Sequence, residues 1–235
     1  MLHCVIEIRS ITASFRNPEF QNFHKSFRLP PPTTLIGLAG AAMGLSPKAA
    51  QDFFDLNPFR AGVMGKAEGM MRDLWKYDTM PGRSVITREL FANTHFWIAF
   101  GSPNDVLVQR VKEAFENPTY ALTMGTSDSL AKVTAVQLIE KEAEHDELND
   151  TLVEGDIVPL VLAQALKGGE FSFGVNDTDP VAYQLPIRFG YESDYGLRKV
   201  AERKLFSFVG PKVKFVDEKF TGVRVDSVFI PTFDL

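Results

Sequence analysis

The first 45 residues carry two patterns that predict regular structure. Residues 4–15 are predicted to form a β-strand, because the apolar Cys4, Ile6 and Ile8 alternate with Glu7 and Arg9 at a period of two. Leu29-Pro30-Pro31-Pro32 is expected to be extended, because each proline disfavours helical backbone in the residue before it. A helix is expected to follow at once, capped by Thr33 or Thr34 and ending near Leu45.

A long hairpin and a second helix are predicted next. The hairpin strands lie within residues 59–100, with Met80-Pro81-Gly82-Arg83 as the turn. The middle of this hairpin is too polar and too rich in methionine to lie wholly in a core, so it should project. The second helix is predicted to begin at Ser102-Pro103 and to stop at Asn117-Pro118.

The order of the predicted elements indicates the fold class. Strands are expected at residues 120–124 and 133–139. Strand, helix, two hairpin strands, helix and strand make an α+β chain with a ferredoxin-like (RRM-like) βαββαβ domain over residues 1–150. Residues 151–235 contain only short strand candidates, beginning at 157–162, and are expected to form a smaller β-rich extension packed on the first domain.

Composition adds the expected compartment. The chain has 235 residues, of which 45% are hydrophobic, enough for an ordinary globular core. No apolar run approaches the roughly 20 residues of a membrane helix. The first residues lack the basic and apolar regions of a signal peptide, so a cytoplasmic protein is expected. The single cysteine, Cys4, lies in the first predicted strand, where a small buried hydrophobe is the favoured reading.

Charge is distributed unevenly along the chain. The net charge of −5 argues against a nucleic-acid binder. Residues 140–156, however, contain eight acids and one lysine, whereas residues 198–224 contain eight basic residues and three acids. Residues 1–48 contain five basic residues and two acids. One acidic segment therefore masks two basic ones, which permits RNA binding without showing it.

Glycines mark one face of the first helix. Gly37, Gly40 and Gly44 recur at spacings of three and four, although each glycine costs about 1 kcal/mol of helix stability relative to alanine. Close helix packing or close approach of a ligand's backbone would offset that cost, and packing is the commoner answer.

Three stretches of the chain together resemble one family. They are ASFRNPEFQNFHKSFRLPPPTTLIGLAGAAMGL, FWIAFGSPNDVLVQRVKEAFENPTYALTMGTSD and the C-terminal VFIP. The first carries most of the weight, with a basic loop, a proline-rich link and a glycine-studded helix. They resemble the CRISPR-associated Cas five (Cas5) family of the RAMP superfamily, in a form similar to that of type I-B systems.

The resemblance implies a non-catalytic subunit of a type I Cascade surveillance complex in antiviral defence. Such a subunit binds and caps the 5′ handle of the CRISPR RNA (crRNA). It contacts a backbone subunit (Cas seven type) and a large subunit (Cas eight type), and meets target DNA indirectly. The family's projecting thumb corresponds to about residues 64–91. The handle-holding surface corresponds to the Arg16–Arg28 loop and the Gly37–Gly44 helix.

The chemistry of these segments suits an RNA end, which needs cations on phosphates and flat groups for unstacked bases. Phe20, Phe23 and Phe27 either stack on bases or pin the loop to the core. The thumb residues either wedge against bases or pack under the hairpin and against partners. The RNA-binding candidates are Arg16, His24, Lys25, Arg28, Thr33, Thr34, Gly37 and Gly40, and the thumb candidates are Met70, Met71, Arg72 and Trp75.

Two other functions remain open. A type I-C-like branch of the family cleaves precursor crRNA without metal, and His24, Lys25 and Tyr77 are the one trio that could be assembled for such an endoribonuclease. No HxxH, HExxH, CxxC, GxGxxG, P-loop or GxSxG spacing occurs, so neither a metal nor a cofactor is expected. A protein–protein adaptor without direct RNA contact is the third reading.

Overall fold

The computed structural model describes residues 1–79, 82–168, 180–210 and 212–235. Across these residues the chain is a strand-rich α+β protein with four helices and one large, mainly antiparallel sheet. The helices are α1 (Pro32–Met43), α2 (Pro47–Asp55), α3 (Asp105–Glu116) and α4 (Val158–Gly168). None of them is long and apolar enough to cross a membrane.

Seven strands form the main path of the large sheet. In spatial order they are β11 (Val181–Tyr191), β12 (Arg198–Val209), β10 (Thr151–Glu154), β5 (Arg60–Thr79), β6 (Gly82–Ser102), β1 (Leu2–Ala13) and β7 (Ala131–Ile139). Two short strands join this sheet beside the path, β3 (Phe23–His24) on β6 and β16 (Phe233–Asp234) on β5. The smaller sheets contain β2 (Phe15–Arg16), β4 (Ser26–Phe27), β8 (Glu142–His145), β9 (Glu147–Leu148), β13 (Val213–Lys214), β14 (Phe220–Val225) and β15 (Val228–Pro231).

The predicted order of the first half is confirmed. β1, α1, β5, β6, α3 and β7 follow one another as strand, helix, hairpin, helix and strand, and β1 pairs antiparallel with both β6 and β7. The strand predicted at residues 120–124 does not form. Thr123 makes only an isolated β-bridge with Leu130. The predicted caps were wrong in two helices. Pro31 precedes α1 without a side-chain cap, and Asn104 rather than Ser102 caps α3.

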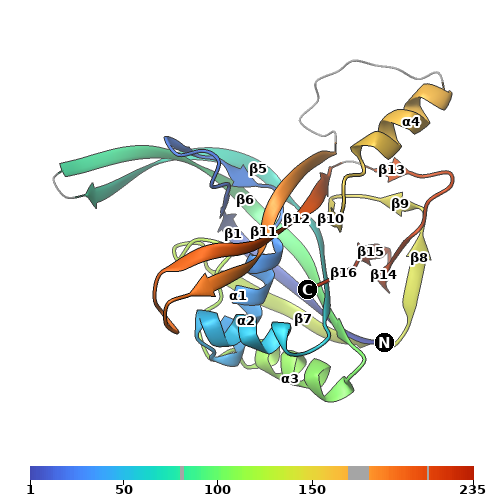
Figure 1. Cartoon of the computed structure of the whole chain (residues 1–235), viewed down its shortest axis with the longest axis horizontal. Helices are drawn as coiled ribbons and strands as arrows, with labels where there is room; N and C mark the ends of the chain where they lie inside the picture. Colours follow the sequence, from blue (N-terminus) through green and yellow to red (C-terminus); the bar gives the residue numbers. More distant parts are fainter. Residues whose placement is uncertain (80–81, 169–179, 211) are drawn as a thin grey trace.

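The hairpin of β5 and β6 is the longest feature of the molecule. Its strands pair from Arg60↔Gly101 to Thr79↔Gly82, and their outer part projects beyond the rest of the sheet (Figure 1). The inner part lies in the core. Met80 and Pro81 of the predicted turn lie outside the described residues.

The C-terminal part continues the same sheet. β10 pairs with β12 and, through Thr151↔Met64, with β5, so the segments on either side of the expected boundary share one sheet. The prediction of a strand at residues 157–162 was wrong, because helix α4 begins at Val158. Residues 151–235 are β-rich apart from this helix.

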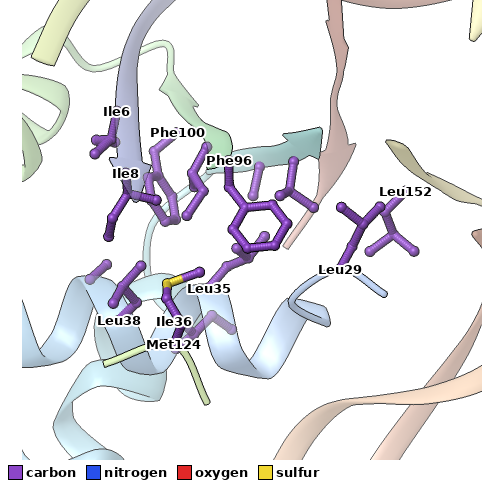
Figure 2. Packing of buried hydrophobic residues seen from close by; sticks show 14 of the residues in the cluster. Ile6, Ile8, Leu29, Leu35, Ile36, Leu38, Phe96, Phe100, Met124 and Leu152 are labelled. Carbon is purple, nitrogen blue, oxygen red and sulfur yellow. The ribbon is translucent and has the colours of Figure 1, made fainter. Parts of the chain in front are cut away.

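The main core lies between the sheet and helix α1 (Figure 2). Ile6 and Ile8 of β1 and Phe96 and Phe100 of β6 point toward the helix, and all four are fully buried. Cys4 belongs to the same cluster, and burial raises the pKa of its thiol to about 12. The prediction that Cys4 is a buried hydrophobe is confirmed.

The glycines of α1 have different surroundings. A Cβ at Gly40 would stand 2.3 Å from the Cβ of Ala50, so this glycine permits α1 to pack closely on α2. Gly37 is exposed, with nothing within 4 Å of its Cβ position. Gly44 lies beyond the helix and adopts a left-handed φ of 73° as its C-cap, where glycine is favoured. The three glycines therefore do not form one surface, since Gly40 packs on α2, Gly44 lies close to Thr119, and Gly37 is open.

We expect Gly40→Ala and Gly37→Ala to change stability in opposite directions. The new methyl group at residue 40 clashes with Ala50 and should cost about 1–3 kcal/mol through overpacking. At residue 37 the methyl group meets open space, and the gain in helix propensity should add up to ~1 kcal/mol. Urea unfolding of both variants measures the two free energies. Equal effects at both positions would contradict the packing assignment.

Candidate nucleic-acid interface

A groove of about 760 Å³ opens between the loop of residues 16–28, the base of the β5–β6 hairpin and the C-terminal strands. We call it the loop–hairpin groove. It brings together parts of the chain that are far apart in sequence. Its lining includes Lys25, Arg28, Lys66, Met70, Arg72, Phe91, Asp150, Tyr183 and Phe208.

The loop is held on the hairpin by backbone pairing. β3 runs parallel to β6, with Phe23 opposite Thr87 and His24 opposite Arg88. The N–H of Ser26 donates to the carboxylate of Glu89 at 3.1 Å, and Glu89 is only 6% exposed. The loop therefore adds a short strand at the base of the projecting hairpin, and its backbone is held against β6.

The cations at the groove have no ion pair with any residue in the part of the chain that the structure describes. They come from both walls, with two from the loop and two from β5. They are Lys25, Arg28, Lys66 and Arg72. Because no carboxylate neutralises them directly, they are available to anionic groups of a ligand.

Several cations of the C-terminal basic segment, unlike those of the groove, form ion pairs within the chain. The acidic segment pairs with the C-terminal basic segment inside the molecule, at nitrogen–oxygen distances from 2.8 to 3.9 Å. The pairs are Lys204–Glu154, Lys212–Glu147, Lys214–Asp146 and Lys219–Glu144. The acidic segment thus accounts for much of the C-terminal basic charge and leaves the loop cations unpaired.

The loop phenylalanines divide between core and surface. Phe27 is 7% exposed and stacks on Phe208 with ring centroids 5.2 Å apart, so it anchors the loop in the core. Phe23 is half-buried, with the guanidinium of Arg72 5.7 Å from its ring centroid. Phe20 is exposed beside the Lys25 ammonium, at 5.3 Å. Of the three, Phe27 has a packing role, and the side chains of Phe20 and Phe23 reach the surface.

Other candidate residues form a second cluster next to the groove. The ring of His24 lies 5.9 Å from that of Trp75, and the guanidinium of Arg88 lies 5.6 Å from the Trp75 centroid. Burial, helped by the positive charges of Arg16 and Arg88, lowers the pKa of His24. His24 therefore lies with Trp75 and near the charge of Arg16, whereas Lys25 and Arg28 line the groove.

The hairpin exposes several apolar side chains. Met70 is 54% exposed, and Met71 and Trp75 are each 44% exposed. Leu74 and Val85, on the same projecting part of the hairpin, are 72% and 60% exposed. The inner hairpin is buried, so this exposure is confined to the outer part.

The start of α1 does not join the groove. Thr33 and Gly37 line a separate hollow of about 40 Å³ next to Phe189 and Arg198. Pro31 and Pro32 have no N–H, and the N–H of Thr34 already donates to the Pro31 carbonyl at 2.8 Å. The N-terminus of α1 therefore offers few backbone N–H donors to a phosphate, although Thr33 and Thr34 were predicted to bind RNA. Gly40, buried against α2, is not at the surface.

Three groove residues were missed by the sequence analysis, for two different reasons. Lys66 follows Gly65 where the predicted hairpin turns polar, and that change of pattern could have marked it. Asp150 and Tyr183 carry no local signal, because the pairing of distant strands brings them to the groove.

The comparisons with known proteins identify the family. The family model described as "CRISPR-associated protein (Cas_Cas5)" matches residues 5–201, which is most of the chain. The chain therefore belongs to the Cas5 family of CRISPR-associated proteins. No similar sequence was found among curated proteins.

Solved structures resemble the chain at low sequence identity. A chain of a "CRISPR RNA-guided surveillance complex" superposes with a TM-score of 0.55 at 12% identity, over 90% of this chain and 91% of that one. A "CRISPR protein from Archaeoglobus fulgidus" gives 0.47 at 14% identity, over 98% and 99% of the two chains. The first similarity supports a shared fold.

Asp128 provides a test of how the hairpin base is held. Arg88 donates to Asp128 at 2.5 Å, and this hydrogen bond holds the pKa of the Asp128 carboxyl below its ordinary value. The stabilisation is present above the unfolded pKa of about 3.9 and is lost as pH falls through the lower folded pKa.

We expect Asp128→Asn to lower the melting temperature by a constant amount above about pH 4, with the difference shrinking at more acidic pH. Thermal unfolding of both proteins between pH 7 and pH 2 measures this difference. A difference that persists unchanged at pH 2 would show that the Asp128 charge is not responsible.

Proposed function

We propose that this chain is a non-catalytic subunit of a type I CRISPR surveillance complex, similar to those of type I-B systems, which binds and caps the 5′ handle of crRNA. The βαββαβ half serves as its ferredoxin-like RAMP module. The proposed partners are the crRNA, a backbone subunit (Cas seven type) and a large subunit (Cas eight type), with target DNA met indirectly in antiviral defence.

The observation that carries the proposal is the set of four unpaired cations along the loop–hairpin groove. Lys25 and Arg28 face the groove from one wall, and Lys66 and Arg72 from the other. A single RNA strand offers phosphates at regular intervals, and cations on both walls suit its backbone. Membership of the Cas5 family and the fold shared with a surveillance-complex chain support the same assignment.

The groove also has apolar surface for bases. Phe91 and Tyr183 are half-buried in its lining, and Phe208 forms part of its floor. Unstacked bases of single-stranded RNA pack on aromatic side chains. A bound strand can therefore place phosphates on the rim and bases against the floor.

We expect Lys25→Ala, Arg28→Ala and Arg72→Ala each to weaken RNA binding similarly for different sequences, because phosphates carry no base identity. Each lost contact should lower the slope of log affinity against log salt by ~0.7 on a single strand. Fluorescence anisotropy of labelled handle RNA with the assembled complex, at several salt concentrations, measures both quantities.

Lys219→Ala is the matched control, because Lys219 pairs with Glu144 and lies outside the groove lining. Its affinity and salt slope should match those of the wild type. If the three groove variants keep affinity and slope while complex assembly fails, the loop is a protein-binding surface and the adaptor reading is correct.

The apolar hairpin residues should behave differently. Trp75→Ala or Met71→Ala removes apolar surface without removing a cation, so the salt slope should stay at the wild-type value. Where the Trp75 ring stacks on a base, its removal should cost about 1–3 kcal/mol of binding. The same titrations provide the readout, and a reduced slope would contradict this role.

We also expect no ribonuclease activity from the chain alone. Lys25 lines the groove while His24 lies against Trp75, so the two are directed to different surroundings. The side chain of Tyr77, the third member of the expected trio, lies outside the described side chains. Incubation with cognate repeat RNA in EDTA should leave it intact. Specific cleavage that His24→Ala abolishes would establish the endoribonuclease instead.

A further inference from the structure

Two carboxylates line the loop–hairpin groove, Glu89, which is bound by the Ser26 N–H, and Asp150. Asp150 is the residue just before β10, and its backbone is fixed on two sides. Its carbonyl accepts the N–H of Gly65 at 2.8 Å, and its N–H donates to the carbonyl of Gly210 at 2.6 Å. These two bonds tie it between the base of the hairpin and the end of β12. The place of its side chain in the groove is therefore set by the sheet and not by a free loop.

The Asp150 carboxylate has no partner of its own. Across the described part of the chain it makes neither a hydrogen bond nor an ion pair, although Lys66 and Arg28 are near enough to act on it electrostatically. Burial raises the pKa of its carboxyl, and these two cations only partly oppose that effect. Asp150 also adopts a left-handed φ of 44°, a backbone conformation that aspartate and asparagine reach more readily than most other residues. A half-buried carboxylate without a partner among the described residues thus lines the groove.

A carboxylate repels phosphate, so it does not serve the backbone of a bound strand. It accepts hydrogen bonds, and the N–H groups of a nucleobase edge are the donors that single-stranded RNA offers. The Watson–Crick edges of the four bases differ in this respect. Guanine presents two adjacent donors, N1–H and the N2 amino group. Adenine, cytosine and uracil each place an acceptor beside their donor, and that acceptor would face the second carboxylate oxygen.

We propose that Asp150 is a base-reading residue that selects a guanine in the RNA strand held by the loop–hairpin groove. The strand's phosphates run past Lys66 and Arg28, and one base turns inward to place its N1–H and N2 amino group on the carboxylate. This inference rests on the proposed function and adds sequence selectivity to it. The cations provide affinity for any strand, and Asp150 distinguishes one base from the others.

The test uses the full chain and three RNA probes. They are an eight-nucleotide oligoadenylate and the same RNA with one central guanine or one central inosine, which lacks the N2 amino group. A strand with a single guanine can slide to place it at Asp150, so the register need not be known. We expect the wild type to bind the guanine probe roughly tenfold more tightly than the oligoadenylate, with inosine between them.

Asp150→Asn should bring the guanine probe to within about twofold of the oligoadenylate, because the amide offers one acceptor and a competing donor. Asparagine tolerates the left-handed backbone, and removing an unpaired carboxylate should not lower the melting temperature. Asp226→Asn is the matched control, since Asp226 is exposed in the β14–β15 turn with a φ of 52°. This variant should keep the guanine preference.

The outcomes separate the inference from the proposed function. Salt-dependent binding of all three probes with equal affinity overturns guanine selection and leaves the RNA-binding role standing. A guanine preference that survives Asp150→Asn also overturns the assignment to this residue. Failure of the chain to bind any of the probes at low salt overturns the inference, and the handle-RNA titration of the assembled complex then decides the proposed function separately.

Discussion

The antiparallel pairing of β5 with β6 is the interaction on which the rest of the structure depends. Near its base this hairpin presents an edge on each side. β1 and then β3 pair with β6, while β10 and β16 pair with β5. The inner hairpin is buried by α1 and the core, so the hairpin is anchored at its base and only its outer part projects. Backbone hydrogen bonds to the hairpin therefore fix both walls of the loop–hairpin groove.

Electrostatic pairing within the chain resolves the apparent conflict between an acidic protein and an anionic ligand. The acidic segment lies against the C-terminal basic segment, where several lysines and carboxylates pair. Exposed pairs of this kind add little stability, typically below about 1 kcal/mol each. Their larger effect is on the distribution of charge. They pair four of the eight basic residues of the C-terminal segment and leave the groove cations as a local positive surface on a chain of net charge −5.

The groove also shows where the fold accepts an unfavourable arrangement. An unpaired carboxylate in a half-buried, left-handed position contributes nothing to stability that a neutral asparagine would not also provide. By contrast, Glu89 is more deeply buried but satisfied by the Ser26 N–H, and it fixes the loop. Two carboxylates a short way apart thus have different roles, one in holding the wall and one in facing the ligand.

The sequence by itself determined the elements whose signal is local. The period-two pattern of residues 4–9 and the hairpin of residues 59–100 were predicted correctly, as was the stop at Asn117-Pro118, because periodicity and proline chemistry act over a few residues. The buried state of Cys4 followed from the same pattern. Local caps were less certain, since serine and threonine compete with neighbouring residues for the same terminal N–H groups.

Only the tertiary structure decided which residues share the groove. Lys25 and Met70 were predicted as parts of two separate surfaces, and the pairing of β3 with β6 brings them to one. Asp150 and Tyr183 reach the same groove because β10 joins β5 and β11 follows through β12. Strand partners distant in sequence are chosen by register and by burial of whole faces, and no short window of residues encodes that choice. The sequence showed the chemistry of each side chain, but it did not show which side chains would be neighbours in the groove.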